Sequence, residues 1–404
     1  MKIFSKRIVL LLALVLTLSL VFTGCSQQPA DSNDTGQETE TPSTPSDGGS
    51  DVIKIGVFEP LTGANAAGGA IEADGVKMAN ELYPEVLGKK VELVVVDNKS
   101  DKVEAANAVE RLIDKENVVA IIGSWGSSFS MAAGDAVRNA QIPAVAASAT
   151  NPLVTLNNDY YFRVCFIDPF QGNVTANYAA NNLGAKKAAI IQEVSNDYSV
   201  GLAKFFIDEF KELTGDDDAI VALANYNTGD QDFSAQLVNI KYQEPDVIFA
   251  PGNFTESALI IKQARELGID TPFLGGDTWE TPEFIDIGGE DVEGAVFSTF
   301  FASEVAITEM STVFLDEYAK RYDNEPAAVT ALGFDAYLVI LDAIERANST
   351  DPVAIRDAIA ETQDFKGAAG TINLDENGDA VKSAIIKVVK DGKFSYMATV
   401  EPSK

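Results

Sequence analysis

The body of the chain alternates between short apolar runs and longer segments in which apolar residues recur with helical spacing. The apolar runs lie at residues 53–58, 91–96, 118–122 and 143–147, and most are rich in β-branched side chains. The segments between them place apolar residues three and four positions apart, as in Val103, Ala106, Val109, Leu112 and Ile113. Continuous apolar strands separated by helices are typical of βαβ units, in which helices cover both faces of a parallel sheet.

The same alternation restarts near residue 188. Strands are expected at residues 188–191, 220–224, 247–250 and 273–275, and helices at residues 198–213, 232–242 and 256–267. Two runs of about 110 residues with one pattern predict two doubly wound α/β domains of similar build. Two long helical patterns follow at residues 309–322 and 327–347. A tight turn at Asn377 and Gly378 then predicts a hairpin between residues 371–374 and 384–389.

The first 24 residues have the pattern of a secretory signal segment. Three positive charges, at Lys2, Lys6 and Arg7, precede an apolar stretch at residues 8–22. That stretch is shorter than the roughly 20 residues that span a membrane, which favours a cleaved signal over an uncleaved anchor. Residues 25–50 follow, and residues 26–50 contain no large apolar side chain, so we expect a flexible polar tether.

Composition narrows the classes of function. The 404 residues include 61 Asp and Glu against 30 Lys and Arg, a formal net charge of -31, which disfavours nucleic acid or an anionic membrane surface as a partner. The chain has no histidine, which removes Ser-His-Asp and Cys-His catalytic units and most zinc sites. Two cysteines, Cys25 and Cys165, exclude a disulfide framework.

Polar residues that follow the predicted strands are the candidates for chemistry, because open parallel sheets bind ligands beyond the carboxyl ends of their strands. Residues 123–128, which include Trp125 and Ser127, join a strand to a helix; the serines there suit either an anion site or a simple helix cap. Ser148 and Thr150 follow the next strand, and Asp277 follows the strand at 273–275. Hydroxyl donors and one carboxylate together complement a zwitterion.

The order and spacing of many short segments resemble the substrate-binding proteins of branched-chain amino acid ABC importers. The segments that carry the resemblance are Ile55-Gly56-Val57 with Pro60-Leu61-Thr62-Gly63, Ile121-Ile122-Gly123 with Ser127-Ser128, Ser148-Ala149-Thr150, Asp197-Tyr198, Asp232-Phe233-Ser234, Gln263-Ala264-Arg265 and Gly333-Phe334-Asp335-Ala336-Tyr337. The resemblance implies the type I periplasmic binding protein fold, two doubly wound parallel-sheet lobes joined by a three-crossover hinge. The implied crossovers fall near residues 165–168, near residues 299–302 and near Ile385. Lobe one would comprise residues 51–166 plus 301–383, and lobe two residues 167–300 plus 384–404.

The resemblance also implies a ligand site between the lobes. Ser127, Ser148 and Thr150 match the residues that hold the carboxylate and amine of the ligand, Tyr198 matches an aromatic lid, and Asp277 matches the acid that meets the ammonium. Asn253 and Phe254 fall where the family places an aromatic residue, and either could face the ligand. Gly68 replaces a tyrosine that is common in the family, and Trp125 is bulky; both bear on specificity for the ligand side chain.

The end of the signal segment, residues 21–25, resembles a bacterial lipobox, although Phe22 replaces the usual leucine. The resemblance implies that Cys25 becomes the lipidated first residue of a protein anchored outside the cytoplasmic membrane. We therefore expect an extracytoplasmic solute-binding lipoprotein.

The expected ligand is leucine, isoleucine or valine, delivered to an ABC permease and its ATPase; another amino acid or a small amide is an alternative. We expect a monomer with no cofactor or metal. A ligand-sensing protein that acts through a receptor is a rival interpretation, and the absence of histidine disfavours an enzyme such as an amidase.

Overall fold

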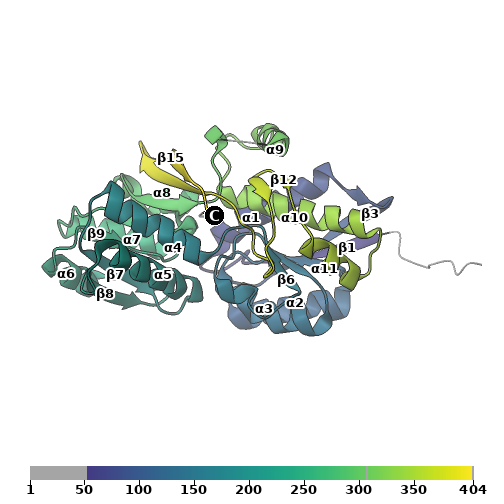
Figure 1. Cartoon of the computed structure of the whole chain (residues 1–404), viewed down its shortest axis with the longest axis horizontal. Helices are drawn as coiled ribbons and strands as arrows, with labels where there is room; N and C mark the ends of the chain where they lie inside the picture. Colours follow the sequence, from purple (N-terminus) through teal and green to yellow (C-terminus); the bar gives the residue numbers. More distant parts are fainter. Residues whose placement is uncertain (1–51, 306–307, 403–404) are drawn as a thin grey trace, which may run out of the picture. The chain divides into compact units, whose positions relative to one another are not determined.

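The computed structural model describes residues 52–305 and 308–402. The predicted signal segment, Cys25 with its predicted lipid, and the predicted tether all lie outside these residues. Among the described helices, none combines the length and the apolar character that a membrane crossing requires. The described chain forms two largely parallel sheets, each covered by helices (Figure 1).

The first lobe is built on a six-stranded sheet with the strand order β2-β3-β1-β4-β5-β6. Its strands are β1 (Val52–Glu59), β2 (Glu85–Val86), β3 (Lys89–Asp97), β4 (Ala120–Ile122), β5 (Ala144–Ala146) and β6 (Tyr161–Arg163). Neighbouring strands run parallel, except that β2 is antiparallel to β3. In β1, Ile55 and Val57 belong to one apolar cluster and Phe58 to another. β1, in the interior of the sheet, is therefore buried on both faces, as its continuous apolar run predicts, whereas β3 nearer the edge is only partly buried.

Two pairs of helices cover this sheet. Helices α1 (Ala66–Leu82) and α10 (Ala328–Ala347) pack on each other, and α2 (Lys102–Arg111) packs on α3 (Ser127–Ala140). Helix α11 (Pro352–Ala360) packs on α10, and α9 (Glu309–Ala319) packs on the small hairpin of β12 (Phe365–Gly367) and β13 (Gly370–Ile372). Glycines let α1 and α10 approach closely, because a Cβ on Gly333 would stand 2.3 Å from the carbonyl oxygen of Glu72.

The second lobe is built on a seven-stranded sheet with the order β15-β14-β11-β10-β9-β7-β8. Its strands are β7 (Ala188–Glu193), β8 (Ile220–Tyr226), β9 (Val247–Phe249), β10 (Phe273–Gly275), β11 (Val296–Thr299), β14 (Ala384–Lys390) and β15 (Lys393–Val400). Strands β7 to β11 run parallel, and β14 and β15 are antiparallel additions at one edge. The surrounding helices are α4 (Asp168–Asn177), α5 (Asp197–Thr214), α6 (Ser234–Tyr242), α7 (Phe254–Glu266) and α8 (Pro282–Gly288).

The chain passes between the two lobes three times. It leaves the first sheet after β6 and enters the second lobe at α4. It returns after β11 to build α10, which contacts β4 and β5, and it crosses again before β14. The described chain therefore has the three connections that the resemblance implies, and neither lobe is one continuous stretch of sequence.

The predicted hairpin near the C-terminus is wrong. The turn exists, because the Gly378 N–H bonds to the Asp375 carbonyl at 3.1 Å, but it closes only an isolated bridge between Leu374 and Ala380. The apolar run after it becomes β14, which pairs with β11 and β15 of the second sheet. In that place the run pairs with a strand on each side, the buried β11 and the edge strand β15, which stabilises it more than pairing with the short strand β13 would.

Candidate ligand-binding site

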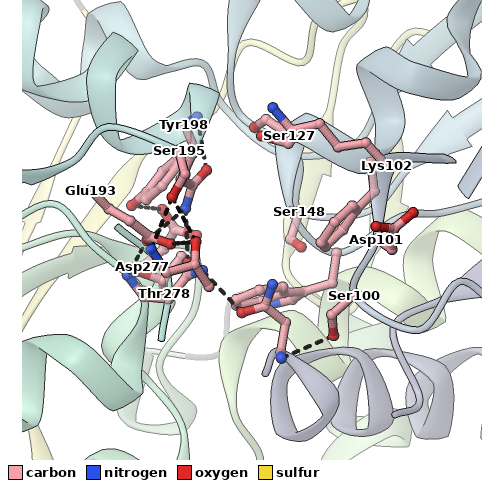
Figure 2. Close-up of a pocket in the computed structure, with 18 residues that line it drawn as sticks. Ser100, Asp101, Lys102, Ser127, Ser148, Glu193, Ser195, Tyr198, Asp277 and Thr278 are labelled. Carbon is pink, nitrogen blue, oxygen red and sulfur yellow. Dashed lines mark hydrogen bonds between the residues drawn. The ribbon is translucent and has the colours of Figure 1, made fainter. Parts of the chain in front are cut away.

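A cavity of about 260 Å³ lies where strand ends of the two lobes face each other (Figure 2). Its lining from the first lobe is Asn65, Ser100, Asp101, Lys102, Trp125, Gly126, Ser127, Ser128, Phe129 and Ser148. Its lining from the second lobe is Glu193, Ser195, Asn196, Tyr198, Thr228, Asn253, Asp277 and Thr278. Asp101, Lys102, Ser195 and Thr228 are exposed and form the rim, whereas Ser127, Ser148, Tyr198 and Asp277 are buried deeper in the site. The cavity is therefore a polar chamber with a solvent-facing mouth.

Asp277 supplies a buried carboxylate just beyond the carboxyl end of β10, where open parallel sheets are expected to bind ligands. Its Oδ1 accepts hydrogen bonds from Gln171 Nε2 at 2.7 Å and from the Tyr198 hydroxyl at 3.0 Å. Burial raises the pKa of Asp277 to about 6, although both hydrogen bonds oppose the rise. The group is thus ionised at neutral pH, and the described contacts leave Oδ2 available to a cation in the cavity.

Tyr198 is the second residue of α5, and its ring is buried rather than exposed on the helix surface. The side chain of Asn196 caps the helix by accepting from the Tyr198 N–H at 3.1 Å, which fixes where the ring leaves the backbone. A Cβ on Gly276 would lie 2.0 Å from the Tyr198 oxygen. Glycine after β10 therefore makes room for the contact between Tyr198 and Asp277.

Ser127 begins α3, and its Oγ accepts a hydrogen bond from the Asn151 N–H at 3.1 Å. Because that oxygen already accepts, the hydroxyl hydrogen of Ser127 remains free to be donated into the cavity. The first backbone N–H groups of α3 also lack partners within the helix. This end of the site is therefore suited to an anion.

Ser148 has the opposite polarity. Its Oγ donates to Oε2 of Glu72, a fully buried residue of α1. Glu72 is paired with Glu59 at the end of β1, which accepts a hydrogen bond from the Trp125 N–H at 2.6 Å. Burial raises the pKa of Glu72 to about 7, and burial together with the Glu72 carboxyl raises the pKa of Glu59 well above its usual value. The wall behind Ser148 and Trp125 is thus a buried carboxyl pair that takes up a proton more readily than free carboxyl groups do.

Trp125 occupies the space that a side chain at position 68 would need. A Cβ on Gly68 would lie 2.4 Å from Cε2 of the indole. The Trp125 ring also meets Phe254 edge-on, with 6.1 Å between ring centroids. Trp125 therefore fills the space beside Gly68, and Phe254 contacts it from the second lobe without lining the cavity itself.

Of the remaining predicted site residues, Asn253 lines the cavity and Thr150 does not. Thr150 is fully buried beside the carboxyl of Asp168, and burial raises the pKa of Asp168 to about 8. The geometry brings Trp125, Ser127, Ser148, Tyr198, Asn253 and Asp277 together at the cavity and leaves Thr150 and Phe254 behind its walls.

The sequence reasoning missed Glu193 and Glu72. Glu193 ends β7 and is fully buried, where its carboxylate accepts from Thr228 Oγ1 and, at 3.0 Å, from Asn196 Nδ2. Glu193 could have been found in the same way as Asp277, because it lies at the carboxyl end of a predicted parallel strand. Glu72 gives no such signal, because an acid in the middle of a helix is usually a solvated residue.

Hydrogen bonds between residues at the cavity join the two lobes. Asp197 accepts from Lys102 Nζ at 2.7 Å and from Ser128 Oγ at 2.8 Å. Although burial opposes it, the hydrogen bonds from Lys102 and Ser128 hold the pKa of Asp197 below its usual value. Asn253 Nδ2 donates to Asn65 Oδ1 at 2.9 Å. These contacts belong to an arrangement in which the lobes are closed on the cavity.

The arrangement can hold a small zwitterion without covalent chemistry. In residues 52–305 and 308–402, no group of three or more Cys, Asp and Glu side chains is arranged to hold a metal ion. The polar groups of the cavity are hydroxyls, amides and carboxylates, with the ammonium group of Lys102 at the rim. Several of them are held by mutual hydrogen bonds, and such preorganised groups orient a ligand.

Comparison with known proteins decides the family. The model of the periplasmic binding protein family matches residues 52–393. The chain belongs to this family. The chain is 46% identical to the leucine-binding protein LivK of Thermotoga maritima, with a TM-score of 0.84 and coverage of 87% of this chain and 99% of that one. The predicted fold, two doubly wound lobes joined by a three-crossover hinge, is confirmed.

Two further relatives agree. The branched-chain amino acid transporter substrate-binding protein LivJ of Streptococcus pneumoniae, solved with isoleucine, is 33% identical, with a TM-score of 0.81 and coverage of 87% of this chain and all of that one. A Leu/Ile/Val-binding protein homologue of Brucella abortus is 28% identical over 355 residues, which cover 85% of this chain and 93% of the relative. These relatives are solute-binding proteins and not enzymes, so the predicted resemblance and the predicted class of binding protein are both confirmed.

Proposed function

We propose that this protein is an extracytoplasmic lipoprotein that captures leucine, isoleucine or valine between its lobes and delivers it to an ABC permease with its ATPase. The observation that carries the proposal is the pairing of opposite polarities across one cavity. Asp277 offers a carboxylate from the second lobe, and Ser127 offers a hydroxyl hydrogen at the start of a helix in the first lobe. An α-amino acid carries an ammonium group and a carboxylate on one carbon. The ammonium group complements the Asp277 carboxylate, and the ligand's carboxylate complements the Ser127 hydroxyl hydrogen.

The names of the relatives support the choice of ligand. LivK is a leucine-binding protein, and LivJ was solved with isoleucine. Trp125 and Phe129 supply apolar surface for a branched side chain, while Ser127 and Asp277 hold the charged end. The volume of about 260 Å³ is large enough for an amino acid of this size.

We further propose that capture occurs by closure of the lobes, with residues 51–166 plus 301–383 as lobe one and residues 167–300 plus 384–404 as lobe two. The three connections support a hinge, and the bonds of Asp197 to Lys102 and Ser128 support a closed state. A ligand that touches both lobes stabilises that state by its differential affinity for it.

The proposed anchor is a lipid on Cys25, reached through the tether of residues 25–50 after removal of residues 1–24. We propose that the protein acts as a monomer. Metabolic labelling with a palmitate analogue tests the anchor: the wild type should incorporate label and Cys25→Ser should not.

Calorimetric titration with the twenty amino acids tests the ligand. We expect saturable binding of leucine, isoleucine or valine with one site per chain, and much weaker binding of the charged amino acids. Tight binding of a different amino acid would correct the ligand, and binding of none would remove the proposed function.

A further inference from the structure

We propose that Glu72 sets the direction of the Ser148 hydroxyl, so that Ser148 accepts a hydrogen bond from the ligand's ammonium group and does so only while the Glu59–Glu72 pair holds a single proton. Glu72 is a positioning residue in this scheme, because it lies behind the wall and acts through Ser148. The inference rests on the proposed function, since it takes an amino acid as the ligand.

The Ser148 hydroxyl forms one hydrogen bond behind the wall and faces the cavity with the rest of its capacity. A hydroxyl has one hydrogen to donate and two lone pairs to accept with. The hydrogen of Ser148 is directed at Oε2 of Glu72. Ser148 lines the cavity, so it presents lone pairs to the ligand and matches a donor such as an ammonium group. Ser127, whose oxygen accepts from Asn151, presents its hydrogen instead and matches the carboxylate.

The two carboxyl groups of Glu59 and Glu72 are placed to share one proton. Glu59 and Glu72 are both fully buried and share a hydrogen bond. Oε1 of each has no other partner among the described residues, which leaves these two oxygens available to share one proton. Oε2 of Glu59 is held by the Trp125 N–H and Oε2 of Glu72 by Ser148. With one proton, the pair carries one negative charge and Ser148 donates to it.

Uptake of a second proton by the Glu59–Glu72 pair reverses the hydrogen bond between Glu72 and Ser148. When the pair takes up another proton, Glu72 becomes a neutral acid whose O–H can be donated to Ser148. The Ser148 hydrogen must then turn toward the cavity, where it faces the hydrogens of the ammonium group. The hydrogen bond between Ser148 and the ligand is therefore available above the pKa of Glu72, which burial raises to about 7, and is lost below it.

Among the described residues, no cation is among the groups that shift the pKa of Glu72; Arg163 and Lys382 act on its neighbours Tyr161 and Cys165 instead. The titratable groups that act on it or feel its charge are Glu59 from β1, Asp277 beyond β10, Tyr161 from β6 and Cys165 after β6. Helix α10 presents the backbone of Gly333 to it. Asp277 also titrates, with a pKa of about 6, so its effect has to be separated from that of the pair.

The experiment compares the wild type with Ser148→Ala by calorimetry with L-leucine, which stays zwitterionic between about pH 6 and pH 8. At about pH 8 the variant should bind roughly 10- to 100-fold more weakly, because the ammonium loses a hydrogen-bond partner. At about pH 6 the difference in affinity between the two proteins should be about five- to tenfold smaller than at pH 8, because the pair in the empty protein is then mostly doubly protonated and the partner is mostly lost. Asp277 is present in both proteins, so its titration cancels in the ratio.

Two further variants complete the test. Glu72→Gln places an amide that does not titrate behind Ser148, so the effect of Ser148→Ala in that background should no longer change with pH. Ser257→Ala is the matched control, because Ser257 is a buried serine outside the cavity, and it should leave leucine binding unchanged. Circular dichroism melts establish that each variant is folded.

The outcomes are separable. A wild type that binds leucine with a pH-independent ratio to Ser148→Ala would overturn the inference and leave the proposed function intact. A wild type that binds no amino acid would remove both. If Glu72→Gln does not fold, the ratio of wild type to Ser148→Ala still decides.

Discussion

Replacing Asp277 with asparagine should have opposite effects on ligand binding and on the stability of the empty protein. Asparagine keeps the shape, and its carbonyl oxygen can still accept from Gln171 and Tyr198. Its amide nitrogen takes the place of the oxygen that faces the cavity. The substitution therefore removes a charge and changes little else.

The effect on binding follows from the loss of a charge partner. An ammonium group left without its carboxylate in a buried site costs about 2–5 kcal/mol. Since each 1.4 kcal/mol is about a factor of ten, leucine should bind at least 25-fold more weakly at neutral pH. The loss should be larger for leucine than for a carboxylic acid that lacks the ammonium group.

The effect on stability follows from the raised pKa. Asp277 has a pKa of about 6 when folded against a usual value of 3.8, so the empty folded state holds its proton more tightly than the unfolded chain does. The penalty for ionising it is absent below about pH 4, grows as the pH rises to about 6, and then stays constant. At about 1.4 kcal/mol for each pKa unit, Asp277→Asn should stabilise the empty protein by up to about 3 kcal/mol at pH 8.

Urea unfolding without ligand and calorimetry with leucine measure the two effects. Asp286→Asn is the matched control, since Asp286 is an exposed acid on α8 of the same lobe and loses the same charge. It should change neither quantity by more than a few tenths of a kcal/mol. Leucine binding within threefold of the wild type in folded Asp277→Asn would refute the role of Asp277 at the ammonium. An empty variant less stable than the wild type at pH 8 would refute the account of its burial.

Three further substitutions probe the lid, the wall and the rim. Tyr198→Ala should raise the leucine dissociation rate at least tenfold in stopped-flow, because the lobe that closes second loses its contact with the ligand, and an unchanged rate would reject the lid. Gly68→Ala should displace the Trp125 indole, since the new methyl would lie 2.4 Å from it, and so weaken binding and shift the tryptophan fluorescence; wild-type affinity and emission would contradict the packing. Lys102→Ala should weaken leucine binding by at most about fivefold, and less at high salt, because its ion pair with Asp197 is half exposed. A loss greater than tenfold would show that this ion pair does more than a surface contact can.

Much of the fold could be predicted from the sequence because apolar strands buried on both faces leave a simple pattern. The run at residues 53–58 became β1 (Val52–Glu59), and the run at residues 188–191 became the first part of β7 (Ala188–Glu193). Which strands pair with each other could not be predicted from the same pattern. Residues 384–389 read as half of a hairpin, and only the position of β11 in space shows that they complete the second sheet.

The site could be predicted where topology alone places a residue. Ser127, Ser148 and Asp277 each follow a strand, and parallel strands bring their carboxyl ends to one edge of a sheet. Glu72 could not be found this way, because it becomes a wall residue only through the close packing of α1 on α10 at Gly333. Thr150 illustrates the reverse: its position in the sequence suits the site, yet its backbone turns the hydroxyl toward Asp168.

The threefold passage of the chain between the lobes has a consequence for the order of events during biosynthesis. The second sheet lacks two of its strands until residues 384–400 have been made, and the first lobe lacks α10 until residue 347. Neither lobe can complete its core while the ribosome still holds the last fifth of the chain. A nascent chain with this topology stays incompletely folded until translation is nearly finished, which keeps it available to any machinery that handles unfolded polypeptides.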